Sequence, residues 1–576
     1  MPQAMRALVG LLALALLVSC AEIEKTRVVI PGTEGQTAGT AKAPGEGPWS
    51  VPETPIPGPA AVPAVPGSKA GLADDNRQFN YFLQFLEQYG KQVPHLPIPV
   101  GERIVLEVAD SEGKPLESAA VEIYSDTGRL LCSGLTYSDG SFLFFPQEFG
   151  PSFSYRAMVT VNEVPREAEF QREGPREVQV RFDFPRPQVR PIPLDMLFIL
   201  DTTGSMGEQV ERLKSTIGTI ALDLSSLSPR PQVRFGLVLY RDRGDIYLNQ
   251  VVPFTANLDE FQVALNRVKA EGGGDVPDDL QAALKEAMGM EWNGEGIRLA
   301  FVITDAPPHL DYEESYTYVD AAHDASAAGI KIFTVGSGGL DLAGEYVLRQ
   351  LSQYTAAKYV LLAPGGQGES EGGAPASVGR HTGANDQSDE LEQIIIRLAK
   401  EELGNAFGQR AEAGEDYFQA TRVAAEDPDE TLQKLFTLAV SQLIDDSSLR
   451  LAPETPASVL PLRPAAAELD QPAEQFTEQL TLSFRRSEQV RKTFRILQPI
   501  DLPNLLQELQ LEPSGLADAK QAARVGGLIG AQVLVIGRLY AKGEDYELFL
   551  ELLRVETGEA LSATKAVIDR RLGLGG

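Results

Sequence analysis

The sequence is short of the residues that build disulfide frameworks and zinc sites. Its 576 residues include only two cysteines, Cys20 and Cys132, and four histidines, which lie at positions 95, 309, 323 and 381 without metal-site spacing. Two cysteines can form at most one disulfide, which is too few for a disulfide-stabilised fold of this size. The histidine pattern does not favour a zinc centre. The chain also lacks a GxxxxGK[ST] phosphate loop and a GxSxG nucleophile elbow, which argues against P-loop nucleotide hydrolases and α/β-hydrolases.

Basic residues are scarce as well. The chain has 51 Lys and Arg against 81 Asp and Glu, for a formal net charge of −30. A nucleic-acid partner would need a basic stripe, and none stands out, so the charge argues against DNA and RNA. An acidic surface is consistent with high solubility, with cation binding and with basic partners, and the net charge alone does not distinguish these roles. The apolar fraction of 43% predicts globular domains, and the length predicts three or four of them.

The first twenty residues have the form of an export signal. Arg6 precedes an apolar run from Ala7 to Val18, which is too short for an ordinary membrane span. The sequence LVSC that ends at Cys20 resembles a bacterial lipobox, which implies cleavage before Cys20 and its acylation. Several acyl chains would anchor the chain firmly, and Ala21, where an aspartate would signal inner-membrane retention, points to the outer membrane. The alternative is an ordinary signal peptide with an incidental cysteine.

A proline- and glycine-rich stretch at 20–71 follows, without a helical or strand period, and predicts a semi-extended tether. At about 3.1 Å per residue, such a tether could reach on the order of 150 Å and hold the folded part away from the membrane. Residues 76–89 then predict a short helix with an apolar face, which we expect to dock on a neighbouring domain. That face carries Phe79, Phe82, Phe85 and Leu86.

Residues 99–190 read as a run of short strands. Strand-like segments alternate with the turn signals SEG at 111–113, DTG at 126–128 and SDG at 138–140, a spacing that predicts an all-β sandwich. The order GKPLESAAVEIY followed by DGSFLFF resembles the carboxypeptidase-regulatory-like and Cna-B-type modules of secreted proteins. The resemblance implies a spacer. Cys132, within RLLCSGLT, is expected to be a buried small hydrophobe rather than a nucleophile.

From 191 to 404 strand and helix patterns alternate. This alternation predicts a doubly wound, mostly parallel α/β sheet with helices on both faces. The expected strands are 195–200, 233–240, 298–304, 330–336 and 358–362. The expected helices are 207–225, 258–270, 278–290, 315–328, 343–355 and 388–403.

Three polar clusters fall at or beside the carboxyl ends of these strands, where ligands of α/β sheets usually bind. Asp201, Thr203 and Ser205 alternate in the loop after the first strand, so their oxygens can point inward together. Asp275 lies in the segment GGGDVPDDL, and Asp305 ends the apolar run AFVIT. A hard cation such as Mg²⁺ or Mn²⁺ prefers oxygen ligands of these kinds. Helix caps and solvated loop acids are the plainer interpretation.

This pattern resembles the von Willebrand factor A (VWA) family and its metal-ion-dependent adhesion site (MIDAS). Asp201, Thr203 and Ser205 match the D-x-S-x-S element, with threonine for the first serine, and Asp305 matches the last aspartate. Asp275 stands where the family has a threonine. The resemblance implies a Mg²⁺ or Mn²⁺ site formed by these five residues. Because three carboxylates would surround one cation, we expect tighter cation binding and weaker attraction for an acidic residue of a partner.

Two other motifs near this site have weaker support. Arg243-Gly244-Asp245 has the form of a cell-adhesion tripeptide, but it is more simply a charged loop beside the metal loops, in which Asp242 could support the site. FILDTTGS also resembles the aspartyl-phosphate loop of haloacid-dehalogenase-type phosphatases and P-type pumps. Phosphatases of that type carry a second aspartate where this chain has Thr203, and pumps need many membrane spans. A non-catalytic role is therefore expected.

After a second linker at 405–430, residues 431–576 predict a smaller α/β domain that ends in an antiparallel strand pair around Ala541 to Asp545. RILQPIDLPNLLQELQLEPSGLAD, GLIGAQVLVIGRLY and LLRVETGEAL resemble the FlgO-like flagellar and CsgG-like curli-secretion lipoproteins. The resemblance implies an envelope-assembly role and possible homo-oligomers. No pair of alternating ten-residue strands of the kind that spans membranes stands out, so a soluble docking domain is favoured.

The sequence thus predicts a membrane-tethered lipoprotein of several domains. We expect it to be non-catalytic, to bind a divalent cation and to bind or scaffold proteins of the cell envelope; the alternatives are a subunit of a secretion or surface-appendage assembly and a Mg²⁺-dependent phosphatase. The expected segments are a signal peptide (1–19), a tether (20–71), a short helix and connector (72–98), a β-sandwich (99–190), a VWA domain (191–404), a linker (405–430) and a CsgG/FlgO-like domain (431–576).

Overall fold

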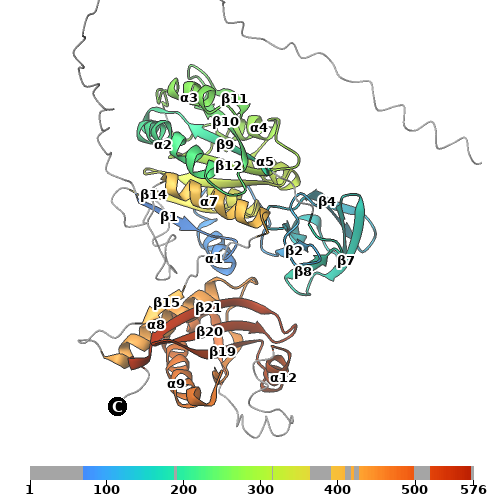
Figure 1. The fold of residues 1–576 in the computed structure, drawn as a ribbon, viewed down its shortest axis with the longest axis vertical. Helices are drawn as coiled ribbons and strands as arrows, with labels where there is room; N and C mark the ends of the chain where they lie inside the picture. Colours follow the sequence, from blue (N-terminus) through green and yellow to red (C-terminus); the bar gives the residue numbers. More distant parts are fainter. Residues whose placement is uncertain are drawn as a thin grey trace, which may run out of the picture. The chain divides into compact units, whose positions relative to one another are not determined.

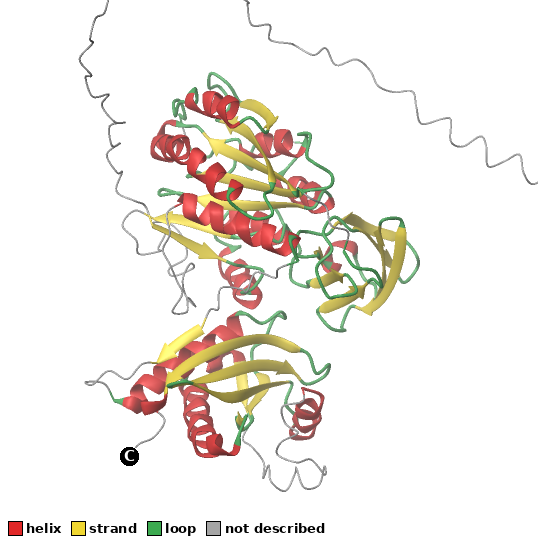
Figure 2. Cartoon of the chain, viewed as in Figure 1, coloured by secondary structure: helices red, strands yellow, loops and turns green. Residues whose placement is uncertain are grey.

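The computed structural model of the chain (Figure 1) describes residues 69–186, 191–274, 276–313, 315–363, 391–408, 417–420, 427–497 and 519–572. Figure 2 marks their helices and strands by type. Across these ranges, none of the helices combines the length and apolar character needed to span a membrane. Cys20 and Asp275, which the sequence predicts as functional, lie outside the described residues.

A seven-stranded mixed sheet organises residues 69–408. In spatial order its strands are β1 (Lys69–Ala73), β14 (Tyr359–Ala363), β13 (Ile330–Gly336), β12 (Ile297–Thr304), β9 (Pro193–Asp201), β10 (Gln232–Tyr240) and β11 (Asn249–Thr255). The five inner strands are parallel, and the two edge strands are antiparallel to their neighbours. Strands β12 and β13 are buried along their whole length, as expected for parallel strands covered on both faces.

Helices cover both faces of this sheet. One face carries α2 (Gly207–Ser225), α3 (Leu258–Asn266) and α7 (Leu391–Ala406). The other carries α1 (Phe79–Tyr89), α4 (Leu280–Met288), α5 (Tyr318–Ala327) and α6 (Leu342–Tyr354). The predicted alternation of strands and helices is confirmed. The predicted ends differ most at α3, which ends at Asn266 rather than at residue 270.

The two antiparallel edge strands are the part of this sheet that the sequence did not predict. Strand β11 follows the charged loop after β10. Strand β1 begins at Lys69, inside the stretch predicted as a tether. Both are short edge strands, and β1 exists by pairing with β14, nearly 300 residues later. A local pattern cannot report such a long-range partner.

The predicted apolar face of the N-terminal helix is present in α1. Phe79, Phe82 and Phe85 are buried, and Leu86 packs at the edge of the same core. The guanidinium of Arg103 lies 4.1 Å from the centroid of the Phe79 ring, an arrangement that adds a cation–π contact to the apolar packing. The segment around α1 is therefore part of the fold of the large sheet.

Residues 104–181 form two smaller sheets. One contains β5 (Ser141–Phe144), β2 (Ile104–Ala109) and β8 (Glu177–Arg181), and the other contains β4 (Leu130–Leu135), β3 (Ala120–Ser125), β6 (Ser154–Val161) and β7 (Val164–Gln171). Alternate residues of both sheets turn into one shared core, the period-two burial typical of strands. A 3₁₀ helix, η1 (Pro146–Phe149), follows β5.

The C-terminal part contains a second mixed sheet. Its strands run in the order β15 (Tyr417–Ala420), β21 (Ala560–Asp569), β20 (Asp545–Arg554), β19 (Val533–Lys542), β16 (Thr455–Val459) and β18 (Phe494–Ile496), while β17 (Arg463–Pro464) pairs with β19. Helices α8 (Pro428–Asp445) and α9 (Asp470–Arg486) pack in one core of this sheet, and α12 (Ala519–Ile529) packs in another. The short elements are η3 (Ala467–Leu469), α10 (Glu488–Thr493) and η5 (Arg570–Leu572).

Two features of this part bear on the predictions. Strands β19 and β20 form the antiparallel pair expected around Ala541, and the chain reverses at Gly543, whose φ is +59°. Strand β15 lies within the stretch predicted as a linker and pairs in parallel with β21. Residues 498–518 of the CsgG/FlgO-like resemblance lie outside the described residues.

Candidate metal centre

Asp201 is the last residue of β9, and its side chain is fully buried. The amide and the hydroxyl of Thr203 both donate to Asp201 Oδ1, at 2.9 and 2.8 Å. The hydroxyl of Thr304, at the end of the neighbouring strand β12, donates to Asp201 Oδ2 at 3.0 Å. Two parallel strands therefore end side by side and fix the orientation of one carboxylate at the edge where such sheets bind ligands.

A chain of hydrogen bonds continues from Asp201 towards solvent. The Thr203 and Ser205 hydroxyl oxygens lie 3.3 Å apart, and Ser205 donates to Asp305 Oδ1 at 3.1 Å. Thr203 is buried, Asp305 is half-buried and Ser205 is exposed. The turn η2 (Gly204–Met206) carries the chain from these residues into α2. Four of the five residues predicted for the site thus lie in one connected cluster that opens to solvent at Ser205.

The glycine-rich loop at 271–274 presses against the Asp201 loop. The amide of Gly204 donates to the carbonyl of Gly272 at 3.0 Å, and the amide of Glu271 donates to the carbonyl of Thr202 at 3.1 Å. Gly273 has a φ of +76°, and a Cβ placed there would lie 2.9 Å from the Cβ of Thr203. The loop can make this close approach only with glycine at that position.

Asp278 is the carboxylate that this loop turns towards the cluster, and the sequence reasoning did not single it out. Its side chain is 3% exposed, and its Oδ1 atom has no hydrogen-bond partner. Its amide donates to the carbonyl of Pro307 at 3.1 Å, which ties the loop to the segment after Asp305. Burial, followed by the charge and contact of Asp201 and the charge of Asp305, raises the pKa of Asp278 to about 8. Asp278 therefore faces the same acids that the sequence predicts as ligands.

Burial raises the pKa of all three acids. Burial raises the pKa of Asp201, and the nearby charge of Asp305 raises it further against the hydrogen bonds from Thr203 and Thr304. Burial also raises the pKa of Asp305. Ionising several buried carboxylates of one cluster is costly without a positive charge nearby. The hydroxyl of Tyr240, buried behind them, also has no hydrogen-bond partner.

The donor set fits a hard cation that shares its shell with water. Across the described ranges, no three Asp, Glu, His or Cys side chains converge closely enough to hold a metal by themselves. A cation at this cluster would therefore combine carboxylates with the hydroxyls of Thr203 and Ser205 and with water, as Mg²⁺ does when it keeps part of its hydration shell.

The loop after β10 braces the site through internal contacts. Arg243 pairs with Asp279 at 3.2 Å, and Asp245 accepts a hydrogen bond from the amide of Gly273 at 3.1 Å. Asp242, which is buried, accepts from the hydroxyl of Tyr312 at 2.8 Å. Both charged residues of the Arg243-Gly244-Asp245 tripeptide thus contact neighbouring loops of the same domain, which fits the charged-loop interpretation.

Comparison with known proteins identifies two regions of the chain. Residues 195–362 match the family profile "von Willebrand factor type A domain", and residues 474–546 match "Curli production assembly/transport component CsgG". The first match spans β9 to β14 and includes the whole candidate site.

Individual relatives cover small parts of the chain. A stretch of 141 residues is 30% identical to the alpha-protein kinase vwkA of Dictyostelium discoideum, covering 24% of this chain and 22% of that protein. A stretch of 111 residues is 36% identical to the mouse von Willebrand factor A domain-containing protein 7, covering 19% of this chain and 12% of that protein. The chain thus spans less than a quarter of the length of these relatives.

A solved structure similar to part of the chain is the LpoB C-terminal domain from Salmonella enterica, with 19% identity over 25% of this chain and 99% of that one and a TM-score of 0.20. The domains of the chain are identified from the two family matches. The chain is a multidomain α/β protein that contains a von Willebrand factor type A domain at residues 195–362 and a CsgG-like domain at residues 474–546.

Proposed function

We propose that the VWA domain binds a divalent cation, Mg²⁺ or Mn²⁺, in a MIDAS-type site formed by Asp201, Thr203, Ser205, Asp278 and Asp305. The observation that carries this proposal is the buried Oδ1 of Asp278, which has no partner and belongs to a carboxylate that faces two others. A cation between the three acids would supply the missing partner and neutralise their repulsion. Asp275, which the sequence predicts as a ligand, lies outside the described residues.

The charge of this site shapes what it can bind. Three carboxylates exceed the charge of one divalent cation, so the bound metal would attract an acidic partner residue less strongly than a site with fewer acids would. In the proposed function the cation is bound jointly by the loops after β9 and β12 and by the loop that carries Asp278. It thereby holds the three loops in one conformation. Those ordered loops would then bind a protein partner.

The proposed setting is the cell envelope, with the chain held to a membrane, most simply the outer membrane, by lipid on Cys20. The CsgG-like domain supports an envelope location, and the lipobox-like LVSC supports the anchor. A scaffold that binds envelope proteins combines both features. The alternative, a subunit of a secretion or appendage assembly, is favoured by the same CsgG-like domain and would appear as defined homo-oligomers in light scattering.

A non-catalytic role is supported by the environment of Asp201. Both of its carboxylate oxygens already accept hydrogen bonds, and its side chain is fully buried, whereas a phosphorylated aspartate must be reached by its substrate. The match to the kinase vwkA covers 22% of that protein. A Mg²⁺-dependent phosphatase would hydrolyse a generic phosphomonoester, and we expect no turnover.

Calorimetric titration of the full chain with Mg²⁺ and with Mn²⁺ tests the proposed site. Saturable binding is expected, and Asp278→Asn should weaken it about tenfold, because it removes one charge from a partly buried cation site. The matched control is Asp311→Asn, which changes an exposed acid in the same domain and should bind as the wild type does. Unchanged affinity in Asp278→Asn would remove Asp278 from the site, and no saturable binding in the wild type would overturn the proposed function.

A further inference from the structure

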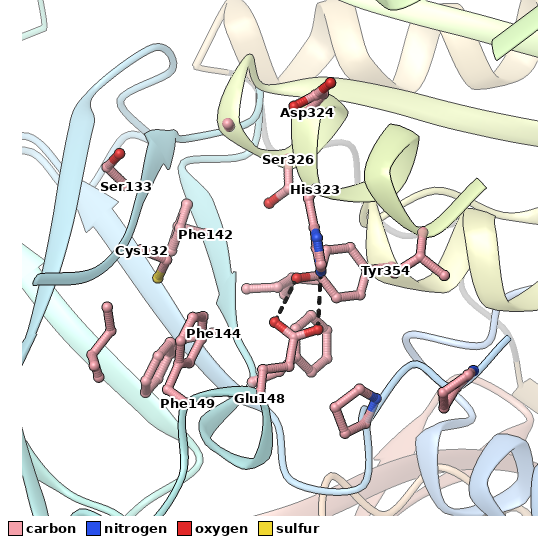
Figure 3. Close-up of a pocket in the computed structure, with 17 residues that line it drawn as sticks. Cys132, Ser133, Phe142, Phe144, Glu148, Phe149, His323, Asp324, Ser326 and Tyr354 are labelled. Carbon is pink, nitrogen blue, oxygen red and sulfur yellow. Dashed lines mark hydrogen bonds and ion pairs between the residues drawn. The ribbon is translucent and has the colours of Figure 1, made fainter. Parts of the chain in front are cut away.

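A cavity of about 500 Å³ lies between the strand β5 and turn η1 on one side and the helices α5 and α6 on the other (Figure 3). Its volume is in the range of sites that hold small organic molecules. Its lining comes from the two smaller sheets together with α5 and α6, and it includes none of the residues of the proposed cation site. Neither family match assigns it a role.

The walls of the cavity are largely aromatic. The rings of Phe144 and Phe149 stack with centroids 5.7 Å apart and planes inclined by 12°. Phe145 stacks on Tyr354 of α6 with centroids 4.6 Å apart. Cys132 of β4 lines the same space, and burial raises its pKa to about 12, so the thiol is an inert part of the wall. An apolar or aromatic body would be well accommodated here.

One largely shielded carboxylate lines this aromatic space. Glu148 has a side chain only 10% exposed. It accepts a hydrogen bond from the hydroxyl of Tyr354 at 2.9 Å, and its Oε1 lies 3.2 Å from His323 Nε2. Figure 3 shows these two contacts on the inner side of the cavity. A carboxylate has about four acceptor positions, so Glu148 can accept further hydrogen bonds from a ligand.

The charges around the cavity favour a cationic ligand. Besides Glu148, the lining contains the acid Asp324, whose Oδ2 accepts from the hydroxyl of Tyr316 at 2.7 Å, and the single basic group is His323. The side chain of His323 is 47% exposed and pairs with Glu148, which raises the pKa of His323, so a ligand ammonium would compete for Glu148 with a partly solvated imidazolium. An anionic ligand would meet two acids, whereas an ammonium group would meet the carboxylate of Glu148 beside aromatic faces, which also attract cations.

The two sides of the cavity are held together by a buried polar cluster. Lys331 of β13 is 4% exposed, and its ammonium lies 3.0 Å from Asp139 and 2.8 Å from Glu402 of α7. Gly134 of β4 approaches so closely that an added Cβ would lie 2.9 Å from the carbonyl oxygen of Ser326 in α5. The cavity is therefore bounded by contacts that leave its walls little freedom, which lowers the ordering cost of binding.

We propose that this cavity binds a small organic amine with an aromatic body, whose ammonium group pairs with Glu148 while its ring packs against Phe144 and Phe149. The site is independent of the cation site of the VWA domain. It would give the protein a small-molecule ligand in addition to the proposed cation.

The probe for this site is 2-phenylethylamine, titrated calorimetrically into the full chain, with 2-phenylethanol as the neutral analogue of similar size. We expect saturable binding of the amine and at least tenfold weaker binding of the alcohol. Glu148→Gln should weaken binding of the amine at least tenfold, because it keeps the shape and removes the charge. Glu167→Gln, which changes an exposed acid of the two-sheet region paired with Arg156, should bind as the wild type does.

A second variant blocks the cavity without touching the carboxylate. Ser133 is exposed and lines the cavity, so Ser133→Trp should fold and abolish binding of the amine. Mg²⁺ titration of both variants should match the wild type, which separates this proposal from the cation site. Equal affinity for amine and alcohol, unchanged binding in Glu148→Gln or Ser133→Trp, or no binding of the amine to the wild type would overturn the proposal.

Discussion

Asp201→Asn is expected to abolish cation binding and to raise the melting temperature of the metal-free chain. Asp201 is buried and lies at the centre of the acidic cluster, so the loss of its charge should weaken Mg²⁺ binding at least about 100-fold, or about 2.7 kcal/mol. The substitution keeps the shape and an acceptor for the two hydrogen bonds from Thr203, and the Thr304 hydroxyl can accept from the new amide. Without metal, the variant lacks one of three mutually repelling carboxylates.

Differential scanning fluorimetry with and without Mg²⁺ measures both effects. The wild type should melt at a higher temperature in Mg²⁺ because the cation binds only the folded state, and Asp201→Asn should not respond to the ion. Asp259→Asn, which changes an exposed acid in the first turn of α3, should behave as the wild type does. A variant that still gains stability from Mg²⁺ would show that the cation binds elsewhere.

Most residues of the candidate site could be predicted because they lie at the carboxyl ends of strands that are recognisable in the sequence. Asp201 and Asp305 end or directly follow apolar strands, and adjacent parallel strands bring their carboxyl ends to one edge. Thr203 and Ser205 then follow from alternation along one loop. The sequence did not point to Asp278, because the segment DVPDD offers three acids. Of the acids in this segment that the structure describes, Asp278 lies next to the cluster because of the path of the glycine loop, in which Gly272 and Gly273 have positive φ.

Two of the strands that escaped prediction, β1 and β15, have a common cause. Strand β1 lies in a sequence rich in glycine and alanine, and β15 lies in a polar stretch between two helices, so neither has a strong strand pattern of its own. Each is completed by hydrogen bonds to a strand far along the chain, β14 in one case and β21 in the other. Inner strands such as β12 carry continuous apolar runs and were predicted within one or two residues.

The docking of the N-terminal connector onto the VWA domain leads to the second large expected effect. Arg349 of α6 is fully buried, and its guanidinium makes two hydrogen bonds to Asp75, one of them at 2.8 Å, and a third to Glu345 at 3.3 Å. It also lies 4.3 Å from the centroid of the Phe85 ring in α1. Asp75→Asn should lower the free energy of unfolding by about 3–5 kcal/mol, because it leaves a buried guanidinium without its main counter-charge.

Urea denaturation followed by the fluorescence of Trp292 measures this loss within the VWA domain, where Trp292 packs edge-on against Phe254. A Trp49→Phe background leaves Trp292 as the single tryptophan of the chain. The matched control, Glu211→Gln, breaks the surface pair with Lys214 on α2 and should cost less than about 1 kcal/mol. An equally small loss in Asp75→Asn would mean that the connector packs on the domain without supporting it. A loss of the expected size would mean that the VWA fold depends on residues more than a hundred positions before its family match begins, and that a fragment starting at β9 lacks part of its core.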